Sequence, residues 1–188
     1  MIRGRTRALA LVAILCSSAL SADESMKILR PTDRAALASG DVDVIATAPG
    51  GTLEIDGKAI EVEQPFPNVF HTRLKLPPGE HRLSLTSTEG RKEIRFFVGT
   101  NPGKEYTAFR VHPPGGADCT KCHELTRRGR FHFKGGCFDC HQTGSFAKIH
   151  THTPEVLNQC GLCHNAHGSS AKSLLVYAKE TACKQCHN

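Results

Sequence analysis

The sequence predicts a mainly β N-terminal sandwich, followed by a C-terminal segment with little regular structure and short helices around repeated CxxCH motifs. Residues 27 to 110 contain no cysteine and alternate apolar with polar residues between turn residues, which is typical of antiparallel strands. Eight of the nine cysteines lie between Cys119 and Cys186. A composition of 39% hydrophobic and 22% charged residues is ordinary for a globular protein and excludes a disordered chain.

Residues 1–21 have the layout of a secretory signal peptide. Three arginines precede an apolar run at residues 8–15, and small residues lead up to Ser21. The run is shorter than the about 20 apolar residues that span a bilayer. We therefore expect cleavage after Ser21 and no transmembrane segment in the mature chain. The periplasm is the expected location, with the outer surface or the extracellular space as alternatives. Lipidation at Cys16 is disfavoured by the bulky residue before it.

Residues 22–110 are predicted to form the sandwich. Asp56-Gly57 suits a two-residue hairpin turn with positive φ, and Pro77-Pro78-Gly79 marks another turn. About six or seven strands in about 80 residues are typical of a sandwich. The expected strands are Val42–Ala46, Thr52–Ile55, Lys58–Val62, Thr72–Leu76, Arg82–Ser87 and Arg91–Val98. The expected inward side chains of the last two are Leu83, Leu85, Ile94, Phe96 and Val98.

The strand, the Asp-Gly hairpin and the Leu-Pro-Pro-Gly-Glu-His turn together resemble bacterial immunoglobulin-like domains. This resemblance implies a fold and no activity. The domain is expected to act as a spacer or stabilising platform. A docking surface for a redox partner or a cell-surface component is the alternative.

Residues 111–188 contain four CxxCH motifs that use all eight late cysteines. The cysteine pairs are Cys119 and Cys122, Cys137 and Cys140, Cys160 and Cys163, and Cys183 and Cys186. The histidines that follow them are His123, His141, His164 and His187. CxxCH is the attachment signature of c-type haem, because two thiols about one helical turn apart can bond both vinyl groups of one porphyrin while the histidine reaches the iron. The motifs therefore predict four covalently bound haem c groups.

A zinc ribbon and a disulfide framework also use paired cysteines. Neither requires the histidine that follows each pair. If the cysteines served zinc, the chance of four such histidines would be on the order of 10⁻⁵. Both alternatives are therefore disfavoured.

Each haem iron needs a second axial ligand unless it is open to substrate. Met26 is the one methionine outside the predicted signal peptide, so histidine must supply at least three of these ligands. An imperfect internal repeat places His112 seven residues before Cys119 and His152 eight residues before Cys160. His150 competes with His152, since residues two apart on an extended segment point the same way. His71 and His81 lie far upstream and are expected to be structural.

The stretch from His164 through His167 to Ser169, followed by Cys183 to His187, is similar to the doubled-CXXCH family of multihaem cytochromes, which includes small tetrahaem proteins of the class III type. The resemblance covers about residues 111–188. It implies a distal ligand three residues after a CxxCH motif, which is His167 in the second copy. Thr126 occupies the corresponding position in the first copy, and His132 is the expected replacement. The predicted distal ligands are His112, His132, His152 and His167, and the haem that each serves is not specified.

These residues predict an exported tetrahaem cytochrome that carries electrons between redox partner proteins and is not an enzyme. Bis-histidine ligation fills both axial sites of iron, which favours outer-sphere electron transfer. One alternative is a small-oxyanion reductase in which one haem iron lacks a distal histidine and is open to substrate. The presence of Thr126 at a position where the family has a histidine is the reason for this alternative. A second alternative is a subunit of a haem-stacked filament, in which His150 could ligate a neighbouring chain.

The net charge of +6 divides unevenly along the chain. The signal peptide carries three of these charges, and residues 111–188 carry nine basic and five acidic residues. An oxidised haem with two ionised propionates adds about −1. Four haems would bring residues 111–188 close to neutrality, so the basic balance does not indicate a nucleic-acid partner.

Overall fold

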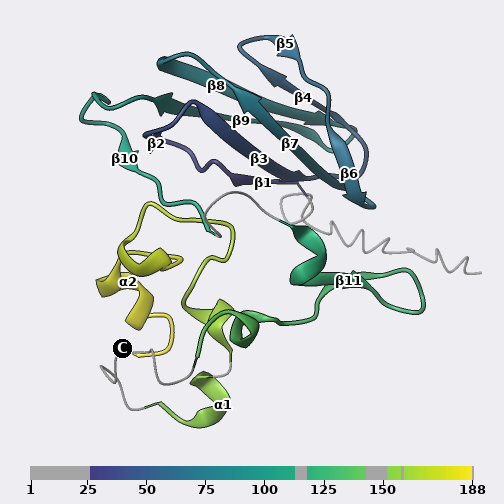
Figure 1. Cartoon of the computed structure of the whole chain (residues 1–188), viewed down its shortest axis with the longest axis vertical. Coiled ribbons are helices and arrows are strands. Elements are labelled where there is room, and N and C mark those ends of the chain that lie inside the picture. The colour runs from purple at the N-terminus through teal and green to yellow at the C-terminus, as the bar shows by residue number, and fades with distance from the viewer. Residues whose placement is uncertain (1–25, 113–117, 143–151, 158, 188) are drawn as a thin grey trace, which may run out of the picture.

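The structure is a computed structural model that describes residues 26–112, 118–142, 152–157 and 159–187. The predicted signal peptide with Cys16, and His150, lie outside the described residues. Figure 1 shows strands β1 to β10 gathered in one layered unit, with the short helices of the C-terminal segment (residues 111–188) on one side of it.

Two β-sheets form the sandwich. The first has the strand order β1-β3-β7-β6, and all of its pairs are antiparallel. The second has the order β10-β2-β9-β8-β4-β5, in which β2 runs parallel to both β9 and β10. The bounds are β1 Lys27–Arg30, β2 Ala35–Leu37, β3 Asp41–Thr47, β4 Thr52–Ile55, β5 Lys58–Ala59, β6 Glu63–Phe66, β7 Val69–Lys75, β8 Gly79–Ser87, β9 Gly90–Val98 and β10 Thr107–Ala108.

Both predicted hairpins are confirmed. Asp56 and Gly57 have φ angles of 51° and 76°, as a type I′ turn between β4 and β5 requires. Strands β8 and β9 pair from Gly79 and Val98 down to Ser87 and Gly90. Strands β1, β2, β6 and β10 were not predicted, because segments of two to four residues are too short to show alternation.

The sandwich has one apolar core between its sheets. Side chains from β3 and β7 meet those from β4, β8 and β9. The five predicted inward residues of β8 and β9 are all buried. Met26 is buried in the same core, and its sulfur accepts a hydrogen bond from Ser87 Oγ at 3.2 Å. Met26 is therefore part of the sandwich core.

The sandwich continues into the C-terminal segment through a short backbone ladder. Beyond β10, the Arg110 amide donates to the Ser169 carbonyl at 2.9 Å, and the Ser169 amide donates back at 3.0 Å. Gly168 precedes this ladder with a φ of 119°. A Cβ at Gly168 would lie 2.7 Å from both the Arg110 carbonyl oxygen and the Phe109 ring. Only glycine allows this close approach.

We expect Gly168→Ala to lower the free energy of unfolding of the haem-loaded protein by about 1–3 kcal/mol, through backbone strain and collision with Arg110. Thermal melts followed by circular dichroism measure the change. Gly129→Ala is the matched control, because Gly129 also has a positive φ of 73° but an added Cβ meets nothing within 4 Å. Equal losses in the two variants would contradict the close-approach explanation.

The C-terminal segment consists of short elements, and the predicted short helices at the motifs are confirmed. These elements leave eight large apolar side chains exposed. They are Leu125, Phe131, Phe133, Phe138, Val156, Leu162, Val176 and Tyr177. The elements are η1 Cys119–Lys121, β11 His123–Leu125, β12 Phe131–Phe133, η2 Cys137–Asp139, α1 Pro154–Leu157, η4 Cys160–Leu162, η5 Lys172–Leu174 and α2 Lys179–Cys183. Across the described ranges, no helix has the length and apolarity needed to cross a membrane.

Candidate cofactor-attachment sites

The four CxxCH motifs share one local geometry. In each, the amide of the second cysteine donates to the carbonyl of the first at 3.2–3.3 Å. In the last three motifs, the histidine amide donates to the same carbonyl at 2.9–3.0 Å. These tight turns hold the two cysteines and the histidine of each motif close together, as attachment to one porphyrin needs.

Across the described residues, the eight motif cysteines form no disulfide. No three Cys, His, Asp or Glu side chains there converge into a metal-binding cluster.

Thiols of different motifs also lie close together. The Cys137 thiol is within hydrogen-bonding reach of the Cys160 thiol, and burial together with this neighbour raises the pKa of Cys137. Burial likewise raises the pKa of Cys119. The second and third motifs are thus direct neighbours, although a long stretch of chain separates them.

Three motif histidines each lie opposite a histidine from elsewhere in the chain. The ring centres of His112 and His141 are 5.8 Å apart with planes inclined by 19°. Those of His123 and His167 are 6.1 Å apart and inclined by 9°. His152 and His187 are also 6.1 Å apart, with an angle of 41°.

These separations fit a shared metal ion. Two imidazoles on opposite faces of one ion, each bonded at about 2 Å, have ring centres about 6 Å apart. Three of the four histidines predicted as distal ligands therefore lie at ring-centre separations that are compatible with a shared iron.

Hydrogen bonds set the orientation of two of the imidazoles. His112 Nδ1 donates to the Ala166 carbonyl at 3.3 Å, and His164 Nδ1 donates to the Ser173 carbonyl at 2.9 Å. A ring whose Nδ1–H is held in this way presents Nε2 to a metal. Burial lowers the pKa of His167 to about 4, with smaller contributions from Arg30 and His123. His167 is therefore neutral at physiological pH, which is the form that binds iron.

His132 and His164 form no ring pair of this kind within the described residues. His132 lies on β12, and its Nε2 is 3.4 Å from Glu124 Oε1 across the hairpin. Its Nδ1 is buried without a hydrogen-bond partner. Thr126, at the position that matches His167, closes the same hairpin by accepting from the Arg130 amide at 3.0 Å.

Comparison with known proteins adds to this geometry. Residues 152–188 match the family model described as the doubled CXXCH motif. This chain carries a doubled CXXCH motif. The motif indicates a multihaem c-type cytochrome with covalently bound haem c, and cytochromes of this type suggest electron transfer with redox partners. No curated protein matches the chain.

Two solved structures are similar to the sandwich. Fibronectin(III)-like modules of CbhA from Clostridium thermocellum are 21% identical, with a TM-score of 0.32 over 41% of this chain and 99% of that one. The twitchin kinase region from C. elegans is 14% identical, with a TM-score of 0.28 over 43% of this chain and 17% of that one.

The residues around the doubled CXXCH motif and its upstream partners fit haem. The paired thiols, the imidazole pairs and the exposed apolar side chains of the C-terminal segment are the three features that a covalently attached, apolar macrocycle would use. His71 and His81 lie in the sandwich and contact other groups there. His71 Nε2 lies 2.7 Å from Asp43 Oδ1, and His81 contacts Asp56 and the Pro77 carbonyl at 2.8 Å each.

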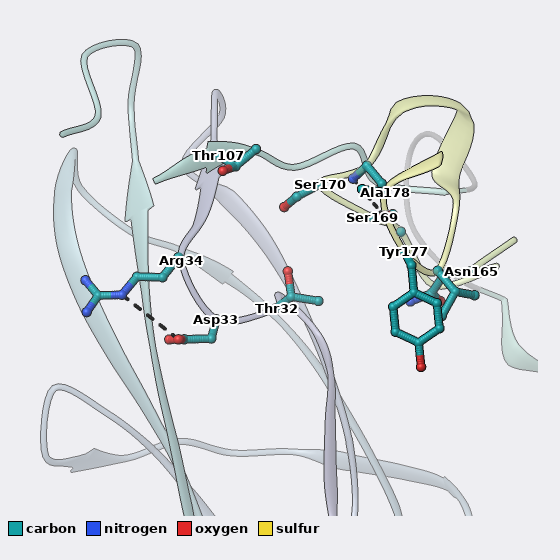
Figure 2. A pocket seen from close by; sticks show the side chains of 12 residues that line it. Thr32, Asp33, Arg34, Thr107, Asn165, Ser169, Ser170, Tyr177 and Ala178 are labelled. Carbon is teal, nitrogen blue, oxygen red and sulfur yellow. Dashed lines mark hydrogen bonds and ion pairs between the residues drawn. The ribbon is translucent and has the colours of Figure 1, made fainter. Parts of the chain in front are cut away.

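A crevice of about 270 Å³ is lined by residues of both the sandwich and the C-terminal segment. Figure 2 shows Thr32 and Thr107 on the sandwich side and Asn165 and Tyr177 on the side of the C-terminal segment, while the Asp33 carboxylate points toward Arg34. Its lining combines hydroxyl and amide side chains with the charged Asp33 and Arg34 and with apolar residues such as Val176.

The sequence did not indicate that Arg30 would contact the C-terminal segment. This residue ends β1, is 1% exposed, and joins the sandwich to the C-terminal segment. The sequence did contain a weak indication that its partner Asp43 needs an ion-pair partner. Asp43 is the one charged residue inside the apolar stretch of β3 from Val42 to Ala46. A charge in such a place is buried only with a partner.

Proposed function

We propose that this chain is an exported tetrahaem c-type cytochrome that carries electrons between redox partner proteins through four closely spaced, mostly bis-histidine haems. The observation that carries the proposal is the pairing of motif histidines with distant histidines at 5.8–6.1 Å. When bound, each haem supplies a one-electron iron couple.

The eight motif cysteines hold the porphyrins, and the four motif histidines are the proximal ligands. We assign His167 to His123, His112 to His141, and His152 to His187 as distal ligands, and the three ring pairs support this assignment. His164 then requires the fourth. His132 is the remaining predicted distal ligand and is proposed for this place.

This ligand set favours electron carriage over catalysis. Two imidazoles on one iron exclude a substrate from it, and Met26 is buried in the sandwich core. The contact between the thiols of Cys137 and Cys160 supports close packing of neighbouring macrocycles. Export follows from the compartment in which c-type cytochromes are usually found, with the periplasm as the expected location.

The haem content and the iron spin state of the exported protein test this function together. We expect intact mass and a haem assay to give four haems per chain, and paramagnetic resonance to give low-spin signals only. Fewer than four haems would contradict the tetrahaem assignment. A high-spin iron that binds carbon monoxide in the native protein would instead favour a reductase with an open haem.

A further inference from the structure

Arg30 connects the two parts of the molecule from a buried position. Its side chain is 1% exposed. One guanidinium nitrogen donates to Asp43, which is 7% exposed in its side chain. Nε donates to the His167 carbonyl at 2.5 Å, and the remaining nitrogen donates to the His112 carbonyl. One side chain of the sandwich thus binds the backbone of two histidines that lie far apart in the sequence.

This geometry requires arginine. A guanidinium presents donors in a rigid planar fork, so Nε and both terminal nitrogens can each bind a different oxygen. Lysine would offer a single point charge and could not span the same three acceptors. Asp43 balances the buried charge, and His71 holds the other oxygen of Asp43 at 2.7 Å. The guanidinium is therefore held in place by contacts within the sandwich, independently of its contacts with the C-terminal segment.

The two histidines that Arg30 binds have imidazoles in different ring pairs. His167 lies opposite His123 of the first motif, and His112 lies opposite His141 of the second. The same two backbone stretches are also joined by the Arg110 and Ser169 ladder, and by the bond from His112 Nδ1 to the Ala166 carbonyl. The guanidinium therefore adds a third connection between these backbone stretches. Together the three connections fix the positions of His112 and His167 relative to the first two motifs.

We propose that Arg30 is a positioning residue that sets the distal ligands of two haems at once, which makes the sandwich part of the cytochrome's ligand-setting structure. The inference rests on the proposed function, because it takes His112 and His167 as ligands. Arg30 acts through the backbone of both histidines and does not itself touch iron. Without it, both distal histidines lose one hydrogen bond that fixes their backbone, whereas the printed hydrogen bonds of Arg30 reach neither His152 nor His187.

The test uses the full haem-loaded chain with the double substitution Arg30→Met and Asp43→Asn. Removing both charges leaves no unpaired buried ion, so the sandwich should stay folded. We expect four haems by mass and an unchanged sandwich by circular dichroism. Paramagnetic resonance should show changed or high-spin signals for two of the four haems, and up to half of the reduced haem should bind carbon monoxide.

The matched control is Arg82→Met with Glu93→Gln. It removes another arginine–carboxylate pair of the sandwich, 3.3 Å apart and exposed to solvent. Its haem signals should equal those of the wild type. Suppose that the folded Arg30 and Asp43 variant keeps four haems, has unchanged paramagnetic resonance signals and binds no carbon monoxide. That result would overturn the proposed role of Arg30 but not the proposed function. A wild-type protein without four low-spin haems would overturn the proposed function itself.

Discussion

A variant in which alanine replaces all eight motif cysteines is expected to lose the ordered structure of its C-terminal segment while the sandwich stays folded. Eight large apolar side chains of that segment are exposed in the polypeptide alone. A segment of fewer than about 80 residues without a core or a staple is not stable. The sandwich has its own buried core, from Val42 in β3 to Val98 in β9.

Hydrogen exchange followed by mass spectrometry measures this effect peptide by peptide. Peptides from residues 160–187 should exchange at close to the rate of an unfolded chain, because local stability there falls toward zero. Peptides from β8 and β9 are the internal control and should keep wild-type protection. If the C-terminal peptides stayed protected without haem, the macrocycles would not be the core of this segment.

The second large effect is expected from His167→Ala. The substitution removes the imidazole that lies 6.1 Å from His123, and with it one of two proposed axial ligands of the first haem. One haem of the four should therefore become high-spin in paramagnetic resonance. About a quarter of the reduced haem should then bind carbon monoxide, whereas the wild type should bind none.

The control for His167→Ala is His81→Gln. His81 is a buried histidine that binds Asp56 and the Pro77 carbonyl inside the sandwich. Its replacement should leave all four haems low-spin. A His167→Ala protein that kept four haems and remained entirely low-spin would show that another side chain ligates the first haem.

Features encoded by neighbouring residues could be predicted from the sequence. A CxxCH motif acts within five consecutive residues, so its chemistry is legible without a fold. The Asp56-Gly57 turn is equally local, and so is the alternation that buries Leu83 and Leu85 against Ile94 and Phe96. Short strands such as β2 and β10 carry no such pattern, and their parallel pairing depends on the rest of the sheet.

The ring pairs and Arg30 could not be predicted in this way. Nothing in the spacing of the sequence says that His112 meets His141 of the second motif, since its nearest motif along the chain is the first. Arg30 lies in an ordinary strand, and its two carbonyl acceptors belong to a different part of the molecule. Backbone carbonyls are the same for every residue type, so the sequence carries no mark of an acceptor.

The sequence by itself determined the β sandwich, the four CxxCH motifs and the set of histidines from which axial ligands are drawn. Only the tertiary structure decided which histidines face each other, and that a sandwich arginine binds the backbone of two of them. The physical reason is range. Covalent attachment and turn formation depend on adjacent residues, whereas ligand pairing and the Arg30 contacts depend on segments that only the folded chain brings together.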